Sequence, residues 1–262
     1  MLELVDVSVA IGPPGHGTEV LSGIDLTVTS GEAVGLVGES GSGKSMTMRT
    51  ILHTLPTPSQ VSGAVRHDGE DVLALRGERL RRFRASEVSM ISQNPQAALN
   101  PVLPVRKYLL EGVLAAKPEL SAEAALDLSR TVLDQVGIAD VDQCLRSYPH
   151  QLSGGMLQRV VIAGSVARGA DLLLADEPTT ALDVTTQADV MAILDDARTQ
   201  AGMAMLFVTH DLDLAAAACD RIAVMSRGRI VETGPAEQVL TDPEHEYTRM
   251  LVRAKPSLDR RG

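Results

Sequence analysis

Hydrophobic and polar residues alternate with a period of two along the first part of the chain, which is typical of strands with one buried face. The alternation covers residues 2–9 (LELVDVSV) and 24–28 (IDLTV), and the Gly- and Pro-rich segment 11–19 between them predicts a turn. Residues 61–69 (VSGAVRHDG) have the pattern of an edge strand that ends in a turn. The N-terminal part is therefore predicted to be a set of short strands.

Continuous apolar runs alternate with helical periodicity in much of the remaining chain. The elements expected after residue 31 are strands at 32–38, 171–178 and 203–211, helices at 44–55, 185–200 and 212–220, and a hairpin at 221–234. A strand that is apolar on both faces needs cover on both sides. This alternation of strands and helices therefore predicts a parallel sheet with helices on both faces.

Residues 95–167 break this alternation, because helical periodicity dominates there and no strong strand pattern interrupts it. Three segments carry the helical period: 105–116, 121–137 and 154–168. We expect them to form a helical lobe inserted into the α/β core. The last residues, 255–262, are expected to be frayed.

Composition and charge narrow the function classes. The 262 residues carry a formal net charge of −10, with no Trp and 2% aromatic residues. These values argue against a basic nucleic-acid surface and against a base-stacking platform. The two cysteines, Cys144 and Cys219, are too few and too far apart for a disulfide framework or a thiolate zinc or iron–sulfur site, so they are interpreted as buried small hydrophobes or inert thiols.

Targeting signals are also not found in the sequence. No apolar run reaches the roughly 18–20 residues that a membrane-spanning helix requires. The N-terminal residues, MLELVDVSVA, lack the basic start of a signal peptide. The protein is therefore expected in the cytosol, where any membrane association would go through a partner.

The segment Gly38–Ser45, GESGSGKS, fits the spacing of a phosphate-binding loop, G-x-x-x-x-G-K-[ST]. Successive backbone N–H groups in such a loop form a concave anion site at the start of a helix. Lys44 would reach the β- and γ-phosphates, and the Ser45 hydroxyl would ligate Mg²⁺. A plain glycine turn is the alternative, but the position between an apolar strand and a helix favours the phosphate loop.

Polar residues at the ends of three apolar runs are further candidates for chemistry. Asp176 ends the run LLLAD and would hold Mg²⁺, while Glu177 would polarise the water that attacks the γ-phosphate. His210 ends LFVTH and is a candidate contact of the γ-phosphate or of that water. Gln93 ends VSMISQ and is a candidate contact of Mg²⁺ or of the water. The alternatives are an acidic turn at the two carboxylates, a structural histidine, and a polar turn residue at Gln93.

A second glycine turn, LSGG at 152–155, stands at the start of the helix expected over 154–168. Ser153 is a favoured N-cap residue, and the glycines expose backbone N–H groups ahead of the helix. This is again the arrangement of an anion site. A capped helix after a flexible turn is the simpler interpretation when the segment stands alone.

In chain order these motifs resemble those of the ATP-binding cassette (ABC) ATPases, and the resemblance covers essentially the whole chain. The family elements are the Gly38–Ser45 loop, Gln93, LSGGM, LLLADEP, ALD at 181–183 and His210. Within the family the chain looks most like ATPase subunits of nickel/oligopeptide (dipeptide)-type importers. The segments that carry this likeness are GESGSGKS, QNPQAALNP, YPHQLSGGMLQR, ADEPTTALDVTTQA and DPEHEYTRMLVRAKP.

The resemblance implies a fold and a division of the chain. The fold would be that of an α/β P-loop NTPase with a mainly parallel core sheet, an N-terminal antiparallel β subdomain and an inserted α-helical subdomain. The ATPase domain would span 1–232, with the helical subdomain at about 95–167. A short C-terminal helical tail would follow at 233–262.

The same resemblance implies a site that two chains share, with ATP and Mg²⁺ as cofactors. The LSGG turn of one chain would cap the γ-phosphate held by the other chain's loop. The implied catalytic residues are Glu177, His210 and Lys44, and the implied metal contacts are Ser45, Gln93 and Asp176. The implied nucleotide contacts are Gly38, Glu39, Ser40, Gly41, Ser42, Gly43, Lys44, Ser45, Met46, Gln93, Ser153, Gly154, Gly155, Asp183 and His210, with Asp183 at the interface between the chains.

The implied role is that of a peripheral subunit on the cytoplasmic face of the cell membrane. It would bind a second ATPase subunit, identical or paralogous, and membrane permease subunits, and act indirectly with an extracytoplasmic substrate-binding protein. ATP hydrolysis would energise uptake of nickel, a metal chelate or di-/oligopeptides. No nucleic acid and no zinc or iron–sulfur cluster is expected.

Two other classes of protein share part of this pattern. A soluble ABC protein that acts on nucleic acid or ribosomes is disfavoured by the acidic charge and the single cassette. A non-hydrolysing partner subunit is disfavoured because Lys44, Asp176, Glu177 and His210 are all present. The chain departs from the wider family at two points. No aromatic residue precedes Phe83, so either Ile11 or His16 contacts the adenine or the base is weakly held, and Met156 stands where Gln is common.

Overall fold

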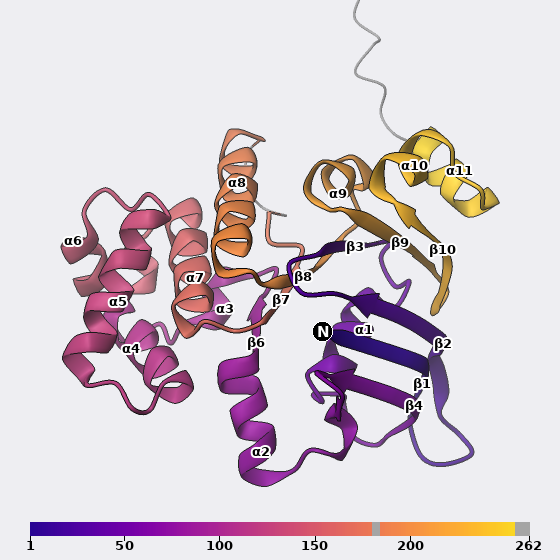
Figure 1. Ribbon diagram of the computed structural model, residues 1–262, viewed down its shortest axis with the longest axis horizontal. Helices are drawn as coiled ribbons and strands as arrows, with labels where there is room; N and C mark the ends of the chain where they lie inside the picture. The colour runs from indigo at the N-terminus through magenta and orange to yellow at the C-terminus, as the bar shows by residue number, and fades with distance from the viewer. Residues whose placement is uncertain (180–183, 255–262) are drawn as a thin grey trace, which may run out of the picture. The chain divides into compact units, whose positions relative to one another are not determined.

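The computed structural model describes residues 1–179 and 184–254 (Figure 1). Two compact units make up the chain. The helical unit contains Met1, Thr29–Gly31 and Ala74–Leu206, and the β-rich unit contains Leu2–Val28, Glu32–Leu73 and the residues from Phe207 onward. Both units are therefore built from segments that are far apart in the sequence.

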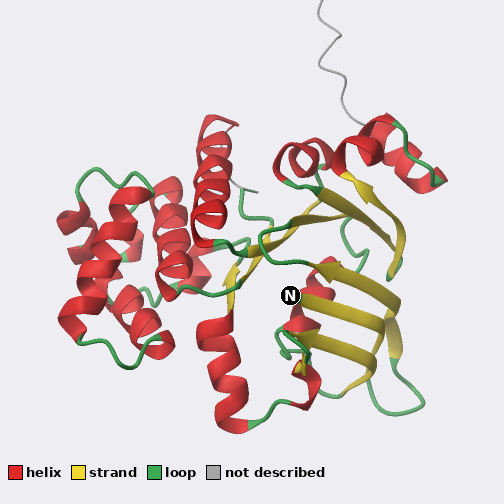
Figure 2. Ribbon diagram, in the orientation of Figure 1, coloured by secondary structure: helices red, strands yellow, loops and turns green. Residues whose placement is uncertain are grey.

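An antiparallel sheet of four strands forms one part of the β-rich unit (Figure 2). Its strands are β1 (Leu2–Ile11), β2 (Thr18–Val28), β4 (Ser59–His67) and β5 (Glu70–Asp71), in the order β2-β1-β4-β5. The alternation of the sequence is confirmed here, since Leu2, Leu4, Val7 and Val9 of β1 are all buried. β4 contains most of the edge strand expected at 61–69, and β5, which the sequence did not predict, pairs with the last two residues of β4 and extends the sheet.

A second group of strands in the β-rich unit leads to the glycine loop at 38–45. β3 (Ala33–Val37) is buried along its whole length and runs parallel to β9 (Arg221–Ser226). β9 pairs in turn with the antiparallel β10 (Arg229–Pro235), which confirms the hairpin expected at 221–234. The helices of this unit are α1 (Lys44–Ile51), α9 (Leu212–Ala218), α10 (Ala236–Thr241) and α11 (Glu246–Arg253).

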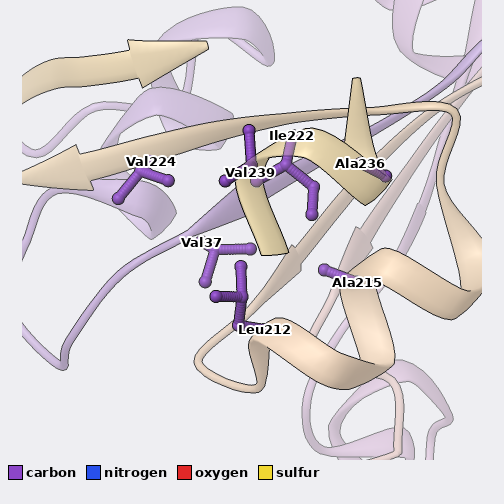
Figure 3. Packing of buried hydrophobic residues seen from close by; sticks show 7 residues of the cluster. All are labelled: Val37, Leu212, Ala215, Ile222, Val224, Ala236 and Val239. Atoms are coloured by element: carbon purple, nitrogen blue, oxygen red, sulfur yellow. The ribbon is translucent and has the colours of Figure 1, made fainter. Parts of the chain in front are cut away.

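Apolar side chains from these strands and helices form one buried cluster, which we call the β3–β9 cluster (Figure 3). Its members are Val37, Leu212, Ala215, Ile222, Val224, Ala236 and Val239. Val37 is the last residue of β3, so the cluster fixes the strand immediately before the glycine loop. Partly buried residues of α11, among them Tyr247 and Leu251, pack against it.

The helical unit contains the three helices that the sequence predicts at 105–116, 121–137 and 154–168. Its elements are α2 (Gly77–Arg82), the π-helical turn η2 (Phe83–Glu87), β6 (Val88–Ile91), α3 (Pro95–Ala98), α4 (Val105–Ala116), α5 (Ala122–Gln135), α6 (Val141–Arg146), η3 (Pro149–Gln151), α7 (Gly154–Arg168), β7 (Leu172–Asp176) and α8 (Val184–Ala201). The short turn η1 (Val72–Ala74) and β8 (Ala204–Thr209) connect the two units along the chain.

Strand pairing and capping explain the local geometry of the helical unit. β6 and β7 run parallel, in a register that pairs Val88 with Leu172 and Ile91 with Ala175. Ser121 begins α5, because its hydroxyl accepts a hydrogen bond from the Ala124 N–H at 3.1 Å. The sequence did not predict α2 and η2, which lie between the expected strands and the helical lobe.

Both cysteines are buried, as expected for small hydrophobes. Burial, followed by the nearby charge of Asp140, raises the pKa of the Cys144 thiol to about 11. A thiol with such a pKa is protonated at neutral pH and is a poor nucleophile. Cys144 is therefore a packing residue of the helical unit.

One glycine of the antiparallel sheet makes a close approach that allows a sharp test. The pairing of β1 with β4 shifts between Val5 and Ser8, and Gly63 lies in β4 opposite this irregularity with a φ of +83°. A Cβ atom added at Gly63 would lie 2.3 Å from the Asp6 carbonyl oxygen. Gly69 has nearly the same φ, +82°, but an added Cβ there meets nothing within 4 Å in the described part of the chain.

We predict that Gly63→Ala lowers the free energy of unfolding by at least about 2 kcal/mol more than Gly69→Ala. Both alanines would have a strained left-handed backbone, but only the alanine at position 63 would also collide with the neighbouring strand. Urea denaturation followed by circular dichroism measures both variants. If both variants lose the same free energy of unfolding, the close approach of Gly63 to β1 does not contribute to stability and the prediction is wrong.

Candidate functional site

The glycine loop lies in the β-rich unit between β3 and α1, where the sequence placed it. β3 ends at Val37 and α1 begins at Lys44. Gly38 packs directly against the backbone, since an added Cβ would lie 2.2 Å from the Met225 carbonyl oxygen. The Ser42 carbonyl accepts a hydrogen bond from the Gly228 N–H at 2.8 Å, which ties the loop to the turn between β9 and β10.

Lys44 is buried, with 6% of its surface exposed, and its ammonium group folds back over the loop. Its Nζ donates hydrogen bonds to the carbonyl oxygens of Gly38 at 2.6 Å and Glu39 at 2.8 Å. These carbonyls replace part of the water that a lysine loses on burial. Both acceptors are neutral, so they stabilise the ammonium group without cancelling its charge.

The residues of the loop fit a phosphate group. The Ser42 hydroxyl is buried and has no hydrogen-bond partner among the described residues. A buried hydroxyl without a partner costs free energy, and a phosphate oxygen in the loop would accept its hydrogen bond. Together with the Lys44 ammonium and the N–H groups at the start of α1, this hydroxyl gives the loop the donor set of an anion site.

The ends of β6 and β7 bring Gln93 and Glu177 together in the helical unit. Gln93 follows β6, and its side-chain Nε2 donates to Glu177 Oε2 at 3.2 Å. Asp176, the last residue of β7, is partly buried and directly precedes Glu177. The two parallel strands end at the same edge, so residues that are 84 positions apart meet.

Glu177 has a backbone conformation that is rare for a residue with a side chain. Its φ is +45°, in the left-handed region. This conformation costs about 1–3 kcal/mol, and residues that adopt it are enriched at active sites and in tight turns. β7 ends at Asp176, and the left-handed backbone at Glu177 breaks the regular alternation of side chains along the strand.

His210 follows β8 in the β-rich unit and is exposed. The chain around it is well fixed. The Thr209 hydroxyl accepts from the Asp211 N–H at 3.0 Å, and the Asp211 carboxylate accepts from the N–H groups of Asp213 and Leu214 at the start of α9. These hydrogen bonds fix the backbone on both sides of His210, directly after the end of β8.

The second glycine turn has the geometry of a capped helix start. The Ser153 hydroxyl accepts from the Met156 N–H at 3.3 Å, and α7 continues for 15 residues from Gly154. Ser153 and Gly154 are exposed. A Cβ added at Gly154 would meet nothing within 4 Å in the residues that the structure describes. Packing within the described chain therefore does not require a glycine at this position.

The predicted site residues are divided between the two units. The loop and His210 belong to the β-rich unit, while Gln93, Asp176, Glu177 and Ser153 belong to the helical unit. Asp183 lies outside the described residues. One contact of the loop escaped the sequence interpretation: the Glu39 N–H donates to the Tyr247 hydroxyl of α11 at 3.2 Å. No spacing or periodicity in the sequence points to this pair.

Known proteins share both the sequence and the fold. Residues 21–180 match the family model of the ABC transporters. The chain is 45% identical, over 98% of its length, to the peptidoglycan transport ATP-binding protein YejF of Agrobacterium fabrum, of which it covers 47%. It is also 38% identical over its full length to the oligopeptide transport ATP-binding proteins OppD of Bacillus subtilis and Salmonella typhimurium, of which it covers 74% and 78%. The chain thus spans about half of the first relative and about three quarters of the other two.

Solved structures agree with this result. The dimeric bacterial ABC transporter cassette MJ0796 superposes with a TM-score of 0.77 at 26% identity, over 90% of this chain and 99% of that one. The same cassette is known in a post-hydrolysis state bound to ADP and Pi. CbiO1 of Clostridium perfringens superposes with a TM-score of 0.78 at 25% identity, over 92% of this chain and 90% of that one. The chain therefore belongs to the ABC transporter family and has the fold of its ATP-binding cassettes.

Proposed function

We propose that the chain binds and hydrolyses ATP as a subunit of an importer that drives the uptake of peptides through membrane permease subunits. The observation that carries the proposal is the glycine loop with its buried Lys44 ammonium and its unpartnered Ser42 hydroxyl. Both groups are donors, and together with the loop N–H groups they are suited to the phosphates of a nucleotide.

ATP and Mg²⁺ are the cofactors of this proposal. The loop from Gly38 to Met46 would hold the phosphates of ATP, and Ser45, Asp176 and Gln93 would hold the metal ion. Bound Mg²⁺ supplies positive charge that neutralises the phosphate oxygens. Hydroxyl, carboxylate and amide oxygens are the ligands that this ion prefers, so the chemistry of the three side chains fits.

Glu177 is proposed to polarise the water that attacks the γ-phosphate. Its carboxylate accepts a hydrogen bond from Gln93 Nε2, which limits the orientations that it can take. Lys44 and His210 would stabilise the negative charge of the phosphoryl group as it is transferred. Phosphoryl transfer depends mainly on positioning and charge stabilisation, and these side chains supply both.

The N-terminus of α7 is proposed to act on the nucleotide of a second ATPase subunit, identical or paralogous. The exposed Ser153 and the open space around Gly154 support this contribution in trans. A solved relative of the same fold is a dimeric cassette. In such an arrangement Ser153, Gly154 and Gly155 would donate to the partner's γ-phosphate, and Asp183 would lie at the interface.

Peptides are the cargo that the relatives favour. The most similar relatives include two oligopeptide transport ATP-binding proteins and one peptidoglycan transport ATP-binding protein. Within the described residues, helices are too short or too polar to cross a bilayer. We therefore propose peripheral attachment to permease subunits on the cytoplasmic face, with an extracytoplasmic binding protein that delivers the peptide. Reconstitution with its permease in vesicles tests the cargo, because ATP-dependent uptake of labelled peptide supports the proposal and uptake of Ni²⁺ alone contradicts it.

Glu177→Gln is predicted to lower the ATP turnover number by about 10²–10⁴-fold while ATP still binds, because the amide cannot accept a proton from the attacking water. A phosphate-release assay and a nucleotide-binding titration measure the two effects. Asp171→Asn is the matched control, since it neutralises an exposed carboxylate just before the same strand begins. Turnover at the wild-type rate in Glu177→Gln would exclude this residue as the base.

Ser153→Arg is predicted to abolish turnover of the assembled ATPase and to leave ADP affinity of the isolated chain unchanged, because the long cation blocks a contact that serves only the other subunit. Ser121→Arg is the control, since Ser121 caps α5 with the same kind of hydrogen bond. Each variant loses one helix cap, worth about 1 kcal/mol. The trans assignment fails if ADP binding collapses in the isolated Ser153 variant, or if both variants lose turnover equally.

A further inference from the structure

The peptide unit that joins Gly38 to Glu39 is held at both of its polar ends. Its carbonyl oxygen accepts the hydrogen bond from Lys44 Nζ at 2.6 Å. Its N–H group donates to the Tyr247 hydroxyl at 3.2 Å. The two groups belong to one rigid plane, so the tyrosine hydroxyl limits the rotation of the carbonyl that binds Lys44.

Tyr247 is itself held by the apolar core of the β-rich unit. It lies in α11 and packs, partly buried, against the β3–β9 cluster. That cluster includes Val37, the residue directly before Gly38 (Figure 3). The ring of Tyr247 and the strand that enters the loop therefore rest on the same buried side chains.

Polar contacts fix the start of α11 as well. The Glu232 carboxylate of β10 accepts from the backbone N–H groups of Glu244 at 2.8 Å and His245 at 3.0 Å. Partial burial alone would raise the pKa of Glu232, but these two backbone hydrogen bonds and the nearby His245 lower it, so the carboxylate is ionised at neutral pH. A charged acceptor makes stronger hydrogen bonds than a neutral one. The segment before Tyr247 is thereby anchored to the sheet.

We propose that Tyr247 is a positioning residue for the phosphate loop. Its hydroxyl holds the Gly38–Glu39 peptide in the orientation that keeps Lys44 over the loop, so the loop is ordered before nucleotide enters. Because the loop is already ordered, nucleotide binding does not have to order it, and the affinity for nucleotide is higher. The C-terminal helix thus contributes to a site far from it in the sequence. This inference rests on the proposed nucleotide site in the loop.

Tyr247→Phe tests the inference, because it removes the hydroxyl and keeps the ring that packs on the cluster. The expected result is an affinity for ADP·Mg²⁺ that falls by about three- to tenfold in the full chain, as measured by calorimetric titration. The KM for ATP in the assembled ATPase should rise by the same factor, with kcat within about twofold of wild type. The unfolding temperature should stay unchanged. Thr241→Val is the control, since it removes a hydroxyl that donates a hydrogen bond within α10, to the Glu237 carbonyl.

The inference is overturned if Tyr247→Phe binds ADP within about twofold of wild type, or more tightly, or if its lower affinity comes with an equal loss in Thr241→Val. A fall in kcat with KM unchanged would also overturn it. Lys44→Ala separates this result from a failure of the nucleotide site itself. If wild type and Lys44→Ala bind ADP equally, the proposed function fails together with the inference; if Lys44→Ala alone loses binding, only the role of Tyr247 is excluded.

Discussion

The arrangement of the phosphate loop depends on a buried positive charge. Lys44 is almost fully enclosed, and an ammonium group loses much hydration free energy on such burial. The carbonyl oxygens of Gly38 and Glu39 replace part of that hydration. For both carbonyls to reach one nitrogen, the loop must curl tightly after β3. Gly38 permits this because a larger residue would collide with the backbone of β9. The buried charge thus requires a tightly curled loop, and the curled loop requires a glycine at position 38.

The parallel direction of two strands explains how Gln93 and Glu177 come together in the helical unit. β6 and β7 are parallel neighbours, and the residues that follow them, Gln93 and Glu177, are hydrogen-bonded although no turn connects them. The left-handed backbone at Glu177 adds a local distortion directly after β7. The regular part of the sheet supplies rigid positions, and Glu177 at its edge is the group that we propose for the chemistry.

Sequence patterns predicted the elements that depend on local chemistry. The glycine loop, the capped start of α7 and the buried strands β3 and β7 follow from residue spacing, because their geometry is set by a few neighbouring residues. The tie between Glu39 and Tyr247 joins residues 208 positions apart through a single hydroxyl, which leaves no periodic signal. The extension of the sheet by β5 escaped for a similar reason, since two residues are too few to form a pattern. Asp183, predicted from a motif, lies outside the described residues.

The open space around Gly154 has a consequence for how the protein behaves at different concentrations. If the exposed start of α7 completes a site on another subunit, a chain in dilute solution holds nucleotide in its own loop without the donors that surround the γ-phosphate. Specific activity then rises with protein concentration, as mass action dictates for any site divided between two molecules. Assembly on a membrane complex removes this dependence, because tethering replaces bulk concentration with a high local one. A freely diffusing subunit would thus consume little ATP before it reaches its transporter.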